Sequence, residues 1–202
     1  RNIFVVMGDP TAIGDYPEAM DNYDLRPSGL IRLIKQGFNA GMDHSGANIG
    51  QPTSFFVGCA LNLNPGDIRK EVDLLNRKIR AGADFILTQP VYIPESIAQI
   101  KSVYEDVYGP LVIPILAGVL PLASARHAAF LHHEIPGIVI PEGIMKRMER
   151  ASGNEAREGI KIAIELVERM AHDVQGIYLM PAFNRFDFAA EIIETIRINV
   201  GV

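Results

Sequence analysis

Short apolar runs rich in β-branched and aromatic residues recur along the chain, and none of them alternates strictly between apolar and polar positions. Strands that are buried on both faces show this pattern, because helices cover both sides of a parallel sheet. The runs lie at residues 3–7, 54–61, 85–89, 112–117, 176–180 and, as a shorter run, 138–140. We expect them to form the strands of a parallel sheet.

Segments with a helical period of 3.6 residues separate these runs. In the first segment Ile68, Val72 and Leu75 recur on one face, and Ser152 and Glu155 match a capping box at the start of a later one. The helical segments span residues 67–81, 95–108, 152–171 and 186–199. Strand and helix therefore alternate, which predicts an α/β fold with a parallel sheet, either doubly wound or a barrel.

The composition is that of a globular protein. The chain has 202 residues, of which 48% are hydrophobic and 21% charged, and we expect one domain. A net charge of -5 without any block of basic residues argues against nucleic acid or an anionic membrane as the main partner. The single cysteine, Cys59, cannot form an internal disulfide, and no leader or membrane-spanning stretch is visible. These features predict a cytoplasmic protein with a small-molecule ligand.

Polar side chains follow the apolar runs, at the points where the predicted strands end. In parallel α/β folds the ligand binds at the carboxyl ends of the strands. The polar residues at these ends are Asp9, Asn62, Asn64, Thr88, Gln89, Asn184 and Arg185. Each of them alone is also typical of a turn or a helix cap, but together they favour a shared site. Gly118 and Pro121 suit a tight turn after the fourth run, where backbone could approach a ligand.

The residue types at these strand ends suit a flat heterocyclic ligand. A carboxylate such as Asp9 accepts two adjacent N–H groups, and an amide such as Gln89 offers one donor and one acceptor in a plane. The pair fits a ring with an amino-oxo edge. Arg185 could pair with a carboxylate of the same ligand.

A charged stripe runs along the predicted helix at residues 67–81. Glu71, Leu74 and Lys78 are spaced at i, i+3 and i+7, and Arg77 is adjacent to Lys78. Such a stripe is either a solvated helix face or a cationic anchor for the phosphates of a cofactor.

Several common site motifs are absent from the sequence. It contains neither a P-loop, nor a GxGxxG turn between strand and helix, nor a GxSxG elbow. His132 and His133 have no carboxylate or cysteine nearby at ligand spacing, and Cys59 lies inside an apolar run. We therefore expect no Rossmann dinucleotide site, no metal site and no cysteine nucleophile.

Five stretches together resemble the methylenetetrahydrofolate reductase family. They are "GDP" at residues 8–10, "DLLNRKIRAGADFILTQPVY" at 73–92, "PILAGVLPL" at 114–122, "IPEGIMKRM" at 140–148 and "FNR" at 183–185. The resemblance runs through nearly the whole chain in order, and "AGADFILTQ" is its most specific part. The stretch at residues 41–65 is similar to the bacterial branch in which a reductase module follows a homocysteine S-methyltransferase module.

The resemblance implies a (β/α)8 barrel that binds FAD noncovalently and uses NAD(P)H to reduce 5,10-methylenetetrahydrofolate to 5-methyltetrahydrofolate. Carried over by motif, Asp9 faces the flavin and the pterin as the catalytic carboxylate, Gln89 binds the folate, and Arg185 lies at the folate end of the site. The residues implied to hold FAD are Glu71, Arg77, Lys78 and Asn64.

Three positions depart from the family's pattern. Leu74 stands where some members have a polar residue, and Ala60 and Asn64 stand where some have tyrosine and histidine. The details of the FAD contacts are therefore open, whereas the family assignment does not depend on them.

In the family, the pattern that begins here with "VVMGDP" belongs to the fourth of eight strands. We therefore expect residues 1–202 to form a single domain that holds strands 4 to 8 of a partial TIM barrel, without strands 1 to 3. Those strands include the glutamate that serves as general acid for the folate. We expect these residues alone to be inactive; truncation, proteolysis, or association with another copy could each account for the open sheet edges.

Two other functions compete with the FAD-dependent reductase. A flavin-free methyltransferase barrel that binds a pterin would use the same carboxylate and amide. A noncatalytic interaction module would bind a partner through the open edges of its sheet. The sequence does not decide between NADH and NADPH, between monomer and homo-oligomer, or whether a methyltransferase module precedes the chain.

Overall fold

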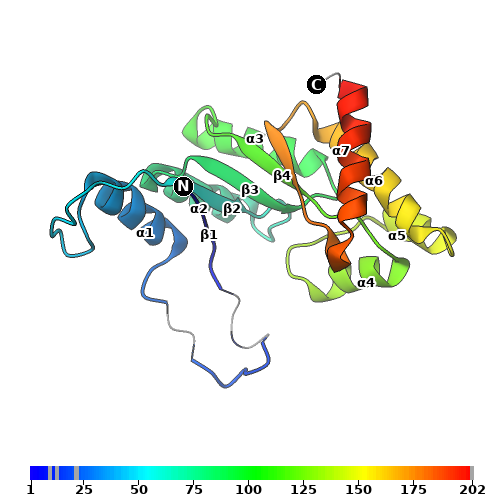
Figure 1. Ribbon diagram of the computed structural model, residues 1–202, viewed down its shortest axis with the longest axis horizontal. Helices are drawn as coiled ribbons and strands as arrows, with labels where there is room; N and C mark the ends of the chain where they lie inside the picture. The colour runs from blue at the N-terminus through cyan, green and yellow to red at the C-terminus, as the bar shows by residue number, and fades with distance from the viewer. Residues whose placement is uncertain (9–10, 12–13, 21–22, 201–202) are drawn as a thin grey trace. The chain divides into compact units, whose positions relative to one another are not determined.

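The structure is a computed structural model that describes residues 1–8, 11, 14–20 and 23–200 (Figure 1). Asp9, the candidate carboxylate after the first strand, lies outside the described residues. By the contacts within it, the chain divides into two compact units. Unit 1 holds residues 1–60 and 73–86, and unit 2 holds residues 61–72 and 87–202.

Five strands form one sheet, in the order β1-β2-β3-β4-β5. β1 pairs with β2 in parallel, and β4 pairs with β5 in parallel. Their bounds are β1 Asn2–Val5, β2 Phe56–Leu61, β3 Phe85–Pro90, β4 Ile115–Val119 and β5 Gly176–Leu179. A doubly wound sheet reverses its strand order at a switch point, whereas each strand here neighbours the next one along the chain. This is the order of a (β/α) barrel and confirms the predicted α/β class.

The helices lie between successive strands, except for α7, which follows β5. They are α1 Pro27–Arg32, α2 Ile68–Ala81, α3 Glu95–Tyr108, α4 Ala125–Glu134, α5 Glu142–Arg150, α6 Glu155–Met170 and α7 Phe186–Val200. A π-helical turn, η2 at Leu33–Gly37, and a 3-10 turn, η3 at Phe38–Ala40, extend α1, and a second 3-10 turn, η4 at Ala182–Asn184, precedes α7. The four predicted helical segments are thus confirmed as α2, α3, α6 and α7.

Two predictions for the segments before α5 and α6 were wrong. Residues 138–140 form no strand: they lie in the segment before α5, where Ile138 and Ile140 are buried and the Ile140 N–H donates to Nδ1 of His132 at 3.1 Å. A short apolar run indicates burial, and here the burial is against helices. The capping box at Ser152 is also absent, because Asn154 is the N-cap of α6 and makes no side-chain cap hydrogen bond.

An ion pair holds the start of β2 and β3 in unit 1. Nζ of Lys35, on η2, donates to both carboxylate oxygens of Asp84 at 2.9 and 2.8 Å. The same carboxylate accepts the Val57 N–H at 2.7 Å, and the Asp84 N–H donates to the Val57 carbonyl at 2.7 Å. Asp84 therefore joins η2 to two neighbouring strands.

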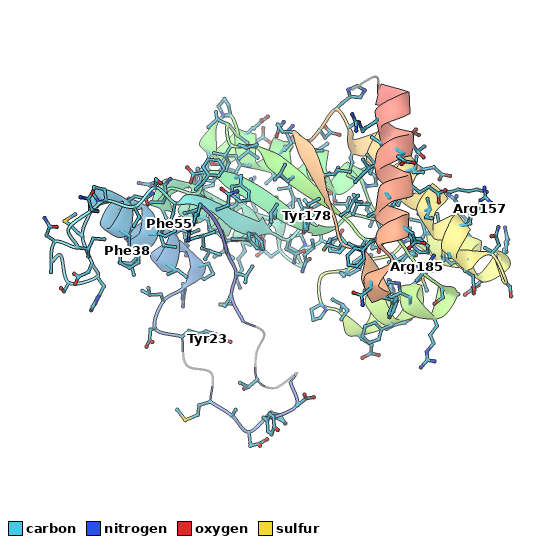
Figure 2. The ribbon with its side chains drawn as sticks, viewed as in Figure 1. Tyr23, Phe38, Phe55, Arg157, Tyr178 and Arg185 are labelled. Atoms are coloured by element: carbon cyan, nitrogen blue, oxygen red, sulfur yellow. The ribbon has the colours of Figure 1, made fainter. Side chains whose placement is uncertain are left out.

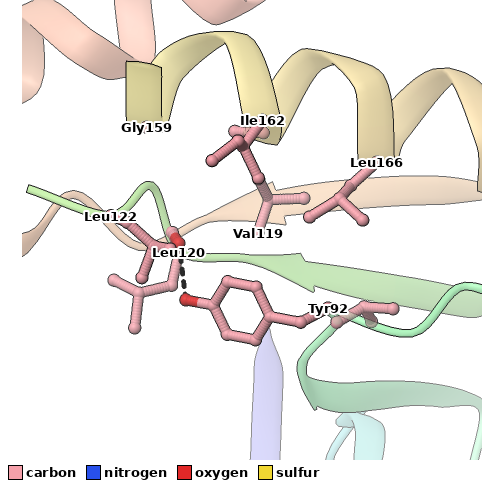
Figure 3. A pocket seen from close by; sticks show the side chains of 9 residues that line it. Tyr92, Val119, Leu120, Leu122, Gly159, Ile162 and Leu166 are labelled. Atoms are coloured by element: carbon pink, nitrogen blue, oxygen red, sulfur yellow. Dashed lines mark hydrogen bonds between the residues drawn. The ribbon is translucent and has the colours of Figure 1, made fainter. Parts of the chain in front are cut away.

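The core of unit 2 contains a very close approach between a helix and the chain after β4. Buried apolar side chains of α4, α5 and α6 pack with Tyr92 and Leu122. Figure 3 shows Gly159 on α6 beside Leu122. A Cβ at Gly159 would overlap the Leu122 carbonyl oxygen and lie 2.8 Å from its carbon. Only glycine allows α6 to lie this near the backbone.

We expect Gly159→Ala to destabilise the protein by about 1–3 kcal/mol or more, because a Cβ there meets backbone that cannot move aside as a side chain could. Chemical denaturation measures this change. Gly143→Ala on α5 is the matched control, since nothing lies within 4 Å of its Cβ position. The control should gain up to about 1 kcal/mol from helix propensity. An unchanged midpoint for Gly159→Ala would contradict the packing described.

We expect Asp84→Ala to cost about 2–4 kcal/mol, because it leaves the half-buried Lys35 cation and the Val57 N–H without their partner. The control is Glu142→Ala, which breaks the exposed Lys146–Glu142 pair on α5. Exposed pairs of this kind contribute only about 0–0.5 kcal/mol. Equal losses of unfolding free energy in the two variants would show that the Asp84 cluster contributes no more than a surface pair.

Candidate functional site

Gln89 is the second-last residue of β3, and the described residues hold its side-chain amide by one end only. Nε2 donates to the carbonyl of Pro136 at 3.3 Å, whereas Oε1 is buried and has no hydrogen-bond partner among the described residues. The Pro136 oxygen can only accept, so this contact fixes which end of the amide is the donor. Oε1 is thus a buried acceptor that no donor among the described residues satisfies.

Glycines surround Gln89 where other residues would collide with it. A Cβ at Gly137, which has φ +82°, would lie 2.8 Å from Nε2 of Gln89. A Cβ at Gly118 would lie 3.0 Å from the Gln89 carbonyl oxygen. The predicted tight turn at Gly118 was wrong, because Gly118 is inside β4. Because Gly118 has no side chain, the backbones of β3 and β4 and the Tyr178 side chain can lie close together.

Arg185 lies between η4 and α7 and already has a partner (Figure 2). Its guanidinium donates to both carboxylate oxygens of Asp187, with the shortest contact at 2.6 Å, and it stacks on the Phe188 ring at 3.7 Å. The hydrogen bonds to Asp187 raise the pKa of Arg185 and lower the pKa of Asp187. A ligand carboxylate at Arg185 would therefore have to share it with Asp187.

The turn before Arg185 has an unusual backbone. Phe183 and Asn184 both have positive φ, at 55° and 57°, in a region that non-glycine residues seldom occupy. The exposed Phe183 ring meets His127 edge-on at 5.1 Å. Nδ1 of His127 accepts the Ala123 N–H, and burial lowers the pKa of His127. Backbone strain of this kind is found at binding sites more often than elsewhere.

In unit 2, Glu71 and Asn64 belong to the connection after β2. Oε1 of Glu71, in the first turn of α2, accepts the Asn62 N–H at 3.2 Å. The Asn64 N–H in turn donates to Oδ1 of Asn62 at 2.9 Å. Both candidate FAD residues are therefore hydrogen-bonded to Asn62. Glu71 thus has a structural contact within the protein, which the sequence did not predict.

In unit 1, Arg77 and Lys78 provide two different cations on α2. Nζ of Lys78 donates to the Ala60 carbonyl at 2.7 Å, and the side chain is half-buried. Arg77 is exposed and forms no ion pair with any residue that the structure describes. A fixed ammonium and an available guanidinium are suitable donors for the pyrophosphate of FAD, so these residues fit the group.

Sequence reasoning missed three residues around Gln89. Pro136 and Gly137 follow α4 and contact the amide, and the hydroxyl of Tyr178 on β5 donates to the Thr88 carbonyl. The glycine after a helical segment was a usable turn signal. Nothing in the sequence indicated that the turn would meet β3, because the two segments are joined only by tertiary contacts.

The described residues contain neither a metal-binding cluster nor a helix that could span a membrane. No group of three or more His, Cys, Asp or Glu side chains that could hold a metal ion occurs among them. Within that same part of the chain, no helix has the length and apolar character needed to cross a membrane.

Known proteins provide three kinds of likeness. The family model described as methylenetetrahydrofolate reductase matches residues 1–197. Methylenetetrahydrofolate reductase 2 of Schizosaccharomyces pombe is 23% identical, covering 87% of this chain and 28% of its own. Methylenetetrahydrofolate reductase 2 of Saccharomyces cerevisiae is 26% identical, covering 84% of this chain and 27% of its own. The chain thus spans less than a third of the length of these relatives.

A solved structure also shares the fold. It is an uncharacterized protein from Clostridium thermocellum that binds two copies of 5-methyl-5,6,7,8-tetrahydrofolic acid. The TM-score is 0.52 at 18% identity, over 73% of this chain and 55% of that one. The family match over residues 1–197, together with the sequential order of the parallel strands, shows that this chain belongs to the methylenetetrahydrofolate reductase family.

Proposed function

We propose that this chain contributes the folate-binding and part of the FAD-binding surface of an enzyme that reduces 5,10-methylenetetrahydrofolate to 5-methyltetrahydrofolate with NAD(P)H. The observation that carries the proposal is the buried, unpartnered Oε1 of Gln89 at the carboxyl end of β3. A buried acceptor without a partner is costly, and a ligand donor would satisfy it.

Gln89 would recognise the pterin through that oxygen. The amino-oxo edge of a pterin carries N–H donors next to an acceptor, and the orientation set by Pro136 leaves Oε1 to accept one of them. The folate-binding neighbour in the solved structures supports this ligand class. Arg185 would hold a carboxylate of the folate in competition with Asp187.

The residues that the resemblance assigns to FAD belong to two units, and each pair is proposed by itself. In unit 1, Arg77 and Lys78 would compensate the charge of the two phosphates. In unit 2, Glu71 and Asn64 are proposed as further FAD contacts. When bound, the flavin supplies the hydride chemistry. The chain's own task is to bind and orient the two molecules.

Asp9 is proposed as the catalytic carboxylate. Its negative charge would stabilise a cationic iminium form of the folate and disfavour negative charge on the flavin. Residues 1–202 would form one domain of a cytoplasmic enzyme, comprising the last five strands of the barrel. A preceding homocysteine S-methyltransferase module and homo-oligomer formation remain predictions.

The second candidate function is a flavin-free methyltransferase barrel, which would use Gln89 in the same way. The available cation Arg77 favours the flavin protein, because a pterin alone has no phosphate for it to bind. The absorbance spectrum of the longest native chain, with and without added FAD, separates the two. A noncatalytic module would bind neither FAD nor folate.

We expect Arg77→Ala in the longest native chain to raise the Kd for FAD about three- to tenfold, because one charge-assisted hydrogen bond is lost. Quenching of flavin fluorescence measures the Kd. Arg157→Ala on α6 removes an equally exposed arginine and should leave the Kd unchanged. Equal Kd values for FAD in wild type and Arg77→Ala would show that Arg77 does not bind FAD. If the wild type binds no FAD, the result favours the methyltransferase.

We expect Gln89→Leu in the same chain to raise the Kd for 5-methyltetrahydrofolate about tenfold, because the ligand donor then meets an apolar group. Titration calorimetry provides the Kd, and NAD(P)H oxidation in the presence of methylenetetrahydrofolate provides the rate. Gln99→Leu, on the exposed side of α3, is the control. If Gln89→Leu keeps the wild-type affinity for folate, Gln89 does not bind the pterin as proposed.

A further inference from the structure

We propose that Thr88 and Tyr178 are positioning residues that fix the direction of the Gln89 side chain. Both side chains are uncharged hydroxyls, and neither is proposed above as a folate or FAD contact. The consequence for folate binding rests on the proposed function, whereas the positioning itself concerns only this chain.

Both peptide groups that flank Gln89 are bound by side-chain hydroxyls. The Tyr178 hydroxyl, on β5, donates to the carbonyl of Thr88, in the peptide before Gln89. The Thr88 hydroxyl donates to the carbonyl of Gln89 itself at 2.7 Å, in the peptide after it. The two peptide planes set the Cα–Cβ direction of Gln89, so these hydroxyls fix where its side chain starts.

The Thr88 hydroxyl cannot rotate freely. Its oxygen accepts the Gly118 N–H at 2.9 Å, and the residue is only 3% exposed. Because an N–H can only donate, the hydroxyl proton must point elsewhere, and it points to the Gln89 carbonyl. β4 therefore holds Thr88, and Thr88 holds the peptide after Gln89.

Gly118 makes room for this arrangement. A Cβ there would lie 2.9 Å from the Tyr178 hydroxyl oxygen and 3.0 Å from the Gln89 carbonyl oxygen. Burial raises the pKa of Tyr178, so its hydroxyl remains a proton donor at neutral pH. Strands β3, β4 and β5 thus meet at one small polar cluster inside unit 2.

Within the described part of the chain, the far end of the Gln89 side chain has one hydrogen bond, from Nε2 to the Pro136 carbonyl. Three rotatable bonds separate the Gln89 backbone from Oε1, so small changes of the peptide planes move that oxygen considerably. The cluster of Thr88, Gly118 and Tyr178 therefore decides whether Oε1 is presented to a ligand donor.

The first test follows Gln89 directly. The side-chain amide signal of Gln89 in a ¹⁵N–¹H spectrum of this chain is identified by its disappearance in Gln89→Glu. Tyr178→Phe and Thr88→Val should shift or broaden it, whereas Thr88→Ser, which keeps the hydroxyl, should leave it near the wild-type position. If Thr88→Val does not fold, Tyr178→Phe and Thr88→Ser still decide the outcome.

The control is Tyr92→Phe. The Tyr92 hydroxyl donates to the Leu120 carbonyl at 2.8 Å, which is the same kind of buried hydrogen bond without a link to Gln89 (Figure 3). Tyr92→Phe should lower thermal stability about as much as Tyr178→Phe and leave the Gln89 signal in place. A Gln89 signal unmoved by Tyr178→Phe, or moved equally by Tyr92→Phe, would overturn the proposal.

The second test measures the Kd for 5-methyltetrahydrofolate in the longest native chain. Tyr178→Phe and Thr88→Val should weaken binding about three- to tenfold, and Thr88→Ser less than about twofold. If the wild type binds no folate while Tyr178→Phe moves the Gln89 signal, the proposed function fails and the positioning stands. If the wild type binds folate and all variants bind it equally, the positioning has no role in recognition and the proposal fails.

Discussion

The pairing of each strand with its neighbour along the chain is the constraint on which the rest of the structure depends. In a parallel sheet of this order, every strand ends at the same edge, so the carboxyl ends of β3 and β5, both in unit 2, lie at one edge of the sheet. Gln89 lies at the carboxyl end of β3, and Arg185 comes after β5. The direction of the strands therefore determines where these candidate residues lie, and the helices return the chain.

Glycine makes the interior of unit 2 possible in two different ways. At Gly159 and Gly118 the absence of a Cβ lets backbone or a hydroxyl approach closely. At Gly137 both the positive φ and the nearby Gln89 amide require it. Gly159 thus determines how tightly α6 packs, Gly118 leaves room for the Tyr178 hydroxyl and the Gln89 carbonyl, and Gly137 leaves room for the Gln89 amide.

Much of the fold could be predicted from periodicity. The bounds of α3 matched residues 95–108, and β3 came within one residue of its predicted end, because strong local patterns there agree with burial. The strand predicted at residues 138–140 was wrong, because apolar residues are buried against helices as readily as in a sheet. Of the candidate site, Gln89 was predicted from its place at a strand end, and the structure has it as the second-last residue of β3, whereas the pairing of Arg185 with Asp187 was not predicted.

The sequence by itself determined the α/β class, the family, and which polar residues lie at or after the strand ends, since these depend on residue type and spacing. Only the tertiary structure decided that Pro136 accepts from the Gln89 amide, that Tyr178 reaches the Thr88 carbonyl, and that Oε1 of Gln89 has no partner among the described residues. The physical reason is that hydrogen bonds between segments 47 or 90 residues apart depend on packing, which no local pattern encodes.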